Sequence, residues 1–144
     1  METAERRGGR VVATVGVFDG VHRGHQRLIA RVLSAAARTG TRPVALTFDP
    51  PPEAVLRRVD EPFQITPAAA KLALLEAHGL EEVHCLAFTP DFARLTPAQF
   101  VQRTLLGLFD PAGLVVGYDF RFGAGGSGNA ELLRSFGRER GFWV

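Results

Sequence analysis

Two histidines three residues apart, His22 and His25, stand in the segment Phe18-Asp19-Gly20-Val21-His22-Arg23-Gly24-His25. If a helix begins here, both imidazoles lie on one face of its first turn, beside unpaired backbone N–H groups and the positive end of the helix dipole. Gly24 lies between them without a side chain, so a phosphate could approach the backbone. Imidazole N–H groups could then follow the charge that develops on a phosphoryl group during transfer.

The same pair could instead ligate a metal ion. No third histidine, cysteine or carboxylate stands at ligand spacing in this segment, so the pattern favours an anion site and predicts no metal ligand. The sequence also has no G-x-x-x-x-G-K-[ST] motif and no G-x-G-x-x-G after its first apolar run. Their absence disfavours a P-loop and a dinucleotide dehydrogenase.

The elements that must position these histidines alternate regularly along the chain. Apolar runs predict strands over residues 11–18, 43–48, 83–88 and 114–117, with a fifth strand beginning at 142–144. Amphipathic or capped segments predict helices over residues 25–38, 66–79, 96–106 and 129–140. This alternation is typical of an α/β fold with a parallel, doubly wound sheet and right-handed crossovers.

Ligands of such sheets bind beyond the carboxyl ends of the strands, where the strand order reverses. If the order is 3-2-1-4-5, that point lies between the first and fourth strands. The segments that follow these two strands are Gly16–Gly20 and Gly117–Phe120. The histidine motif and a second group of polar and aromatic residues are therefore expected at one site.

Size, charge and composition set bounds on the function. The 144 residues fit a single domain over 1–144, and a net charge of +2 gives no argument for a nucleic-acid or membrane partner. Cys85 is the only cysteine, which suits a reducing compartment. No apolar run reaches the roughly 20 residues that span a bilayer, and the first ten residues lack a signal-peptide pattern. We therefore expect a cytoplasmic protein.

Four motifs, in order, resemble those of the H-x-G-H nucleotidyltransferases, and most closely the FMN adenylyltransferase domain of bacterial riboflavin kinase/FAD synthetases. The segment 14–26 is similar to Gly-x-Phe-Asp-Gly-Val-His-x-Gly-His-Gln, and 46–52 to the T-F-D-P-H-P loop. Residues 92–101 resemble F-x-x-L-x-P-x-x-F-V, and 115–123 resemble V-V-G-x-D/N-F-x-F-G. The similarity covers nearly all of residues 11–144.

The resemblance implies a Rossmann-like nucleotidyltransferase fold and the reaction of ATP with FMN, with Mg²⁺, to give FAD and pyrophosphate. It implies catalytic roles for residues that hold or orient the ATP phosphates: His22, His25 and Asp119. It implies an ATP pocket shaped by Gly16, Phe18, Asp19, Gly24 and Gly117. It implies a flavin side formed by Phe48, Asp49, Pro50, Pro52, Phe120 and Phe122, although Phe48, Phe120 and Phe122 could equally be core residues.

The chain departs from the family pattern in two places. Pro51 stands where the family loop has histidine. The family's Ser/Thr-Arg motif and the riboflavin kinase domain that normally follows it do not occur before Val144, so the resemblance implies a domain incomplete at its C-terminus. Two other hypotheses stay open: a nucleotide- or flavin-binding module without catalysis, and another H-x-G-H enzyme such as a cytidylyltransferase or pantetheine-phosphate adenylyltransferase.

Overall fold

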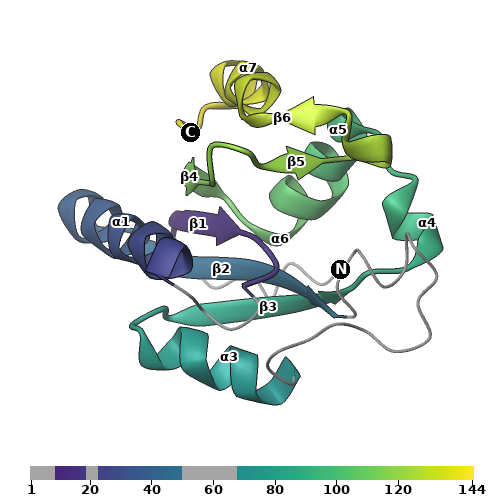
Figure 1. Ribbon diagram of the computed structural model, residues 1–144. Coiled ribbons are helices and arrows are strands. Elements are labelled where there is room, and N and C mark those ends of the chain that lie inside the picture. The colour runs from purple at the N-terminus through teal and green to yellow at the C-terminus, as the bar shows by residue number, and fades with distance from the viewer. Residues whose placement is uncertain (1–8, 19–22, 50–67) are drawn as a thin grey trace.

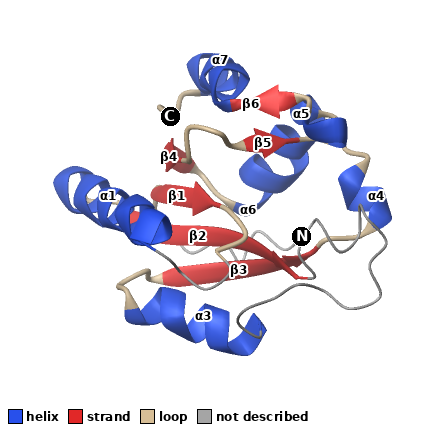
Figure 2. Cartoon of the chain, viewed as in Figure 1, coloured by secondary structure: helices blue, strands red, loops and turns tan. Residues whose placement is uncertain are grey.

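The computed structural model describes residues 9–18, 23–49 and 68–144, and a four-stranded parallel sheet forms its centre (Figures 1 and 2). The strands are β1 (Val11–Val15), β2 (Arg42–Asp49), β3 (Glu82–Ala87) and β4 (Pro111–Val115). Their order is β3-β2-β1-β4, and Trp143 forms a parallel bridge with Gly113 of β4. The order 3-2-1-4 considered from the sequence is therefore confirmed, and the expected fifth strand is present only as this bridge beside β4.

Helices cover both faces of this sheet. One face carries α1 (Arg23–Thr39) and α3 (Ala68–Ala77). The other carries α7 (Ala130–Arg140) and one helical stretch made of α5 (Pro97–Gln99), η3 (Phe100–Leu105) and α6 (Leu106–Leu108). A short helix, α4 (Pro90–Ala93), follows β3 beyond the carboxyl end of the sheet (Figure 1). The predicted doubly wound α/β fold is confirmed.

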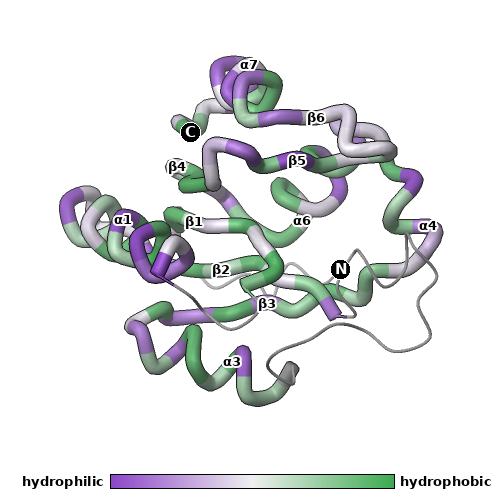
Figure 3. The backbone as a smooth tube through the Cα atoms, in the orientation of Figure 1, coloured by the Kyte–Doolittle hydropathy of each residue, from purple (hydrophilic) through white to green (hydrophobic). Residues whose placement is uncertain are grey.

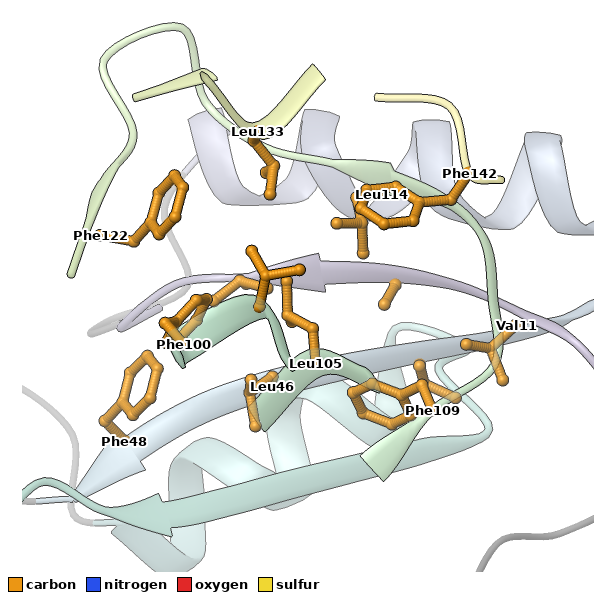
Figure 4. Close-up of a cluster of buried hydrophobic side chains, with 14 residues drawn as sticks. Val11, Leu46, Phe48, Phe100, Leu105, Phe109, Leu114, Phe122, Leu133 and Phe142 are labelled. Atoms are coloured by element: carbon orange, nitrogen blue, oxygen red, sulfur yellow. The ribbon is translucent and has the colours of Figure 1, made fainter. Parts of the chain in front are cut away.

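Successive side chains of each strand point to opposite faces of the sheet, and this divides the hydrophobic core into two clusters. Val12 and Ala45 face α1 and α3, where they pack with Ile29, Val32 and Leu75. The intervening strand residues face the helical stretch and α7 on the opposite side. The main buried residues of that second cluster are Val11, Leu46, Phe48, Phe100, Leu105, Phe109, Leu114, Phe122, Leu133 and Phe142 (Figure 4). Because β1 is buried on both faces, it is hydrophobic almost throughout (Figure 3).

Local signals in the sequence set several helix ends. Thr96 and Gln99 form the predicted capping box, in which the Thr96 hydroxyl accepts from the Gln99 amide and the Gln99 side chain accepts from the Thr96 amide. Asn129 caps α7 by accepting from the amide of Leu132, and Gly141 ends it in the left-handed conformation. These contacts set where the two helices begin and where α7 ends.

Three features differ from the sequence-based expectations. The first strand ends at Val15 rather than Phe18, and Phe18, three residues further on, adopts a positive φ of 57°. The helix expected over 96–106 is π-helical from Phe100 to Leu105 and continues to Leu108. A two-stranded antiparallel sheet of β5 (Arg121–Phe122) and β6 (Gly128–Asn129), joined through the 3₁₀ turn η4 (Ala124–Gly126), lies where no strand was expected.

Candidate active site

A cavity of about 770 Å³ opens between α1 and the carboxyl ends of β1 and β4, and we call it the polar cavity. The sheet order reverses at this point, since β1 lies between β2 and β4. Six predicted nucleotide-site residues line it together: Gly16, Phe18, Gly24, His25, Gly117 and Asp119. The structure therefore brings together two segments that are about 100 residues apart in the sequence.

The backbone at Phe18 and the side chain of His25 are held together. Phe18 is 1% exposed and has a φ of 57°, a conformation that is uncommon and costly for a bulky residue. Its ring meets the His25 imidazole edge to face, with centroids 5.1 Å apart at 74°. His25 lies in the first turn of α1 and is half-buried, so its ring is fixed at the wall of the cavity.

The opposite wall is formed by the chain that follows β4. A Cβ atom on Gly117 would lie 3.2 Å from Oδ1 of Asp119, so the glycine leaves space for the carboxylate to fold back toward the backbone. Asp119 is exposed, and it is the one carboxylate among the described residues that line the polar cavity. A single carboxylate there can orient a phosphate-bound cation but cannot hold one without further ligands.

Positive charge dominates the polar cavity. Arg27 and Arg31 of α1 and Arg134 of α7 line it with exposed side chains. None of these guanidinium groups forms an ion pair with any residue in the ranges that the structure describes. Three guanidinium groups without an ion pair among the described residues, a helix N-terminus and an imidazole make this cavity suited to a polyphosphate.

A second cavity of about 390 Å³ lies beyond the carboxyl ends of β1 and β2 on the other face of the sheet, and we call it the aromatic cavity. Six phenylalanines line it: Phe48, Phe88, Phe92, Phe100, Phe120 and Phe122. Each packs on another with ring centroids 5.4 to 6.1 Å apart. Figure 4 shows Phe48, Phe100 and Phe122 in succession along one side of the core. Flat apolar walls of this kind suit a planar ring system.

The predicted flavin-side residues Phe48 and Phe122 are 7% and 6% exposed, and they belong to the core and to the cavity wall at once. Phe120 is half-buried and stacks on Phe122 at an interplanar angle of 18°. A core position and a position on a binding surface therefore do not exclude each other for these phenylalanines. The side chains at the edge of the hydrophobic core also form the wall of the aromatic cavity.

Three lining residues, Phe88, Phe92 and Phe100, were not predicted as site residues. Each is delivered by a different element: Phe88 follows β3, Phe92 lies in α4, and Phe100 begins the π-helical turn. A π-helical turn is rare and is found frequently at functional sites. For Phe92 and Phe100 the available signal was the motif over 92–101, in which both match the phenylalanines of the F-x-x-L-x-P-x-x-F-V pattern.

The two cavities share part of their walls. Val15, Gly16 and Phe120 line both of them, so they meet where β1 ends. A Cβ atom on Gly16 would lie 3.1 Å from the Phe18 ring, so a larger residue at this junction would require that buried ring to shift slightly. A ligand in one cavity can therefore lie next to a ligand in the other.

The remaining predicted site residues fall elsewhere. Asp49 ends β2 and is not among the residues that line either cavity. Asp19, His22, Pro50 and Pro52 lie outside the residues that the structure describes. Within the described ranges, no group of three histidine, cysteine, aspartate or glutamate side chains could hold a metal ion.

Comparison with known proteins relates the whole chain to one family. A family model described as FAD synthetase matches residues 4–144. A bifunctional riboflavin kinase/FMN adenylyltransferase of Pseudomonas fluorescens is 36% identical, covering 92% of this chain and 42% of the relative. Proteins of the same name from Escherichia coli K12 and Bacillus subtilis 168 are 36% and 37% identical, covering 91% and 85% of this chain and 42% and 39% of the relatives. The chain thus spans less than half the length of these relatives.

A solved structure described as a macrolide-efflux protein from Streptococcus pneumoniae has the same architecture. Its TM-score is 0.77 at 30% sequence identity, over 90% of this chain and 44% of that one. Of the helices within residues 9–18, 23–49 and 68–144, none has both the length and the hydrophobicity needed to cross a membrane.

Proposed function

Because the chain belongs to the FAD synthetase family, whose model matches residues 4–144, we propose that it transfers AMP from ATP to FMN, giving FAD and pyrophosphate. The observation that carries this proposal is the pair of cavities meeting at Gly16 and Phe120. The cationic polar cavity suits the triphosphate, and the aromatic cavity suits the isoalloxazine ring. The names of the relatives support the same pair of substrates.

In this reaction a phosphate oxygen of FMN attacks the α-phosphorus of ATP. The bond from that phosphorus to the bridging oxygen breaks, and pyrophosphate leaves with the electron pair. His25, at the positive end of α1, would donate a hydrogen bond to the phosphates as charge passes to the leaving group. We assign His22 and Asp19 to the same phosphate site from the motif, although both lie outside the described residues.

Mg²⁺ would arrive with the triphosphate rather than occupy a cage of protein ligands. Asp119 is the one described carboxylate on the polar cavity, which fits an ion held mainly by phosphates and water. Mg²⁺ bound there would neutralise charge on the phosphates. The relatives are named as bifunctional, so we further propose that this activity is fused to a riboflavin kinase domain in the whole protein.

The experiment replaces His25 by alanine and compares it with His78→Ala, an exposed histidine near the end of α3. We expect His25→Ala to lower FAD formation by about 10²-fold, the scale of one lost donor to developing charge, with little effect from His78→Ala. Equal rates in the two variants would place the chemistry elsewhere. Binding of ATP and FMN without FAD formation would indicate a binding module, and a cytidine-containing product would indicate another nucleotidyltransferase.

A further inference from the structure

Lys71 is the only lysine in the chain, and its side chain is 1% exposed. It lies in the first turns of α3, on the face that packs against the sheet. Lysine is almost never fully buried, because removing an ammonium from water is costly unless its hydrogen bonds are replaced. All other basic side chains of the Lys/Arg type in this chain are arginines, so we looked for the contacts that stabilise this one buried lysine.

The Lys71 ammonium donates a hydrogen bond to the carbonyl oxygen of Phe48 at 3.3 Å. This carbonyl lies just beyond the end of β1. The last bond of the β1–β2 ladder runs from the Gly16 amide to the Leu46 carbonyl, at 3.0 Å. Carbonyls two residues apart point the same way, so the Phe48 carbonyl also points toward β1, where the chain has already turned away at Phe18. Lys71 supplies the donor that a longer β1 would have provided.

Two other polar groups lie near this ammonium. Cys85 of β3 pairs in register with Thr47, and Asp49 ends β2. Burial raises the pKa of the Cys85 thiol; the Lys71 charge acts against that rise and the Asp49 charge adds to it. The ammonium, the carboxylate and the thiol thus all lie at the carboxyl ends of β2 and β3.

Phe48 connects this arrangement to the aromatic cavity. Its carbonyl is held by α3 from one face of the sheet, whereas its ring packs on the other face. There the ring contacts Phe88 and Phe92, with centroids 5.8 and 5.6 Å away, and forms part of the cavity wall. A shift of the Phe48 backbone would move this wall directly.

We propose that Lys71 is a positioning residue for the acceptor substrate: it fixes the end of β2 and so holds the Phe48 ring against the flavin. This inference rests on the proposed function, since it assigns the aromatic cavity to FMN. Lys71 does not touch either substrate, because its side chain has almost no exposed surface. Its effect is therefore expected on FMN affinity and not on ATP affinity.

The test compares Lys71→Met, which keeps the length and removes the donor, with Leu75→Val. Leu75 is 0% exposed one turn further along α3, so its substitution weakens the packing of the same helix without touching Phe48. We expect Lys71→Met to raise the FMN dissociation constant roughly tenfold, the scale of one charged hydrogen bond, with the ATP constant changed less than about twofold. Lys71→Arg, which retains a donor, is expected to recover part of the loss.

Backbone hydrogen exchange gives a readout that needs no substrate. The Phe88 amide donates to the Asp49 carbonyl at 3.4 Å, so its exchange reports on the end of β2. We expect faster exchange there in Lys71→Met than in Leu75→Val, with the Gly16 amide little changed. Parallel losses of FMN and ATP affinity, or equal exchange in the two variants, would overturn the positioning role. If the unmodified chain binds no FMN, the proposed function fails, and exchange at Phe88 still decides whether Lys71 fixes the strand end.

Discussion

The ring of Phe18 meets the imidazole of His25 edge to face at a centroid distance of 5.1 Å, on a backbone that turns through positive φ. This contact joins the end of β1 to the first turn of α1 across the segment 19–22. The strain at Phe18 and the orientation of His25 are therefore two parts of one arrangement. A strained residue that supports a polar group is a frequent feature of active sites.

Replacing Phe18 by leucine is expected to weaken ATP binding while leaving the fold intact. Leucine keeps most of the buried apolar volume but loses the edge-to-face contact, worth about 0.5–1.5 kcal/mol, or roughly 2- to 10-fold in affinity. Titration with ATP measures the effect. Phe109→Leu is the matched control, because Phe109 makes the same kind of contact with His84, at 5.1 Å and 89°, and lines neither cavity. Equal ATP affinities in the two variants would contradict the role given to Phe18.

Replacing Gly123 by alanine is expected to disturb the aromatic cavity. Gly123 has φ 78° and ψ 173°, a region open almost only to glycine, and a Cβ atom there would lie 2.8 Å from the ring and nitrogen of Pro97. Pro97 begins the helical stretch that carries Phe100, so a displacement there moves the wall of the cavity. We expect a loss of at least about 2 kcal/mol in the free energy of unfolding and roughly tenfold in FMN affinity.

Gly141→Ala provides the control for this variant. Gly141 also has positive φ, at 88°, but its ψ of 34° is in the left-handed helical region, and a Cβ atom there would meet nothing within 4 Å. Gly141 lines neither cavity, so we expect Gly141→Ala to lower the free energy of unfolding by only about 1–2 kcal/mol and to leave FMN affinity nearly unchanged. Chemical unfolding and flavin fluorescence measure both quantities. A loss of FMN affinity for Gly141→Ala as large as for Gly123→Ala would contradict the importance of the contact with Pro97.

Replacing Glu82 by glutamine is expected to destabilise the β2–β3 pair at neutral pH and less so in acid. Burial acts to raise the pKa of Glu82. The hydrogen bonds from Arg42 and His84, and the positive charges of these two residues, have a larger opposite effect and hold the pKa below the ordinary value of 4.5. With the folded pKa below the unfolded one, the stabilisation is complete above the unfolded pKa and is lost as pH falls through the folded pKa.

Urea unfolding at neutral pH and at a pH well below 4.5 measures the difference in free energy of unfolding between wild type and Glu82→Gln. We expect this difference to be on the order of 1 kcal/mol at neutral pH. Glu81→Gln is the control. Its carboxylate lies 3.6 Å from the same guanidinium but is 45% exposed, so its contribution is smaller. A pH-independent difference between wild type and Glu82→Gln would show that the charge of Glu82 is not what stabilises the pair.

The strand order and the place of the polar cavity could be predicted because each rests on strong local signals. Alternating apolar runs and capped helices fix a parallel sheet, and the handedness of the crossovers leaves few orders possible. The cap formed by Thr96 and Gln99 was likewise predictable, since both partners lie within one turn. Gly16, His25 and Asp119 could be expected at one site because they follow strands that are neighbours in the predicted order.

The aromatic cavity could not be assembled in the same way. Periodicity does not separate a π-helical turn from an α-helix, so the direction of Phe100 was not predictable. The β5 and β6 strands are two residues each, too short for an alternating pattern to show. The burial of Lys71 was not predictable either, because its hydrogen-bond partner, the carbonyl of Phe48, lies 23 residues away in the sequence.

Phe120 belongs to the walls of both cavities, and this has a thermodynamic consequence. Any ligand that shifts the Phe120 ring in one cavity changes the surface that a ligand meets in the other. The resulting coupling is reciprocal, because the factor by which bound nucleotide changes the affinity for flavin must equal the factor by which bound flavin changes the affinity for nucleotide. If a ligand in one cavity moves the Phe120 ring, the ligands of the two cavities can therefore bind cooperatively without any movement of whole domains.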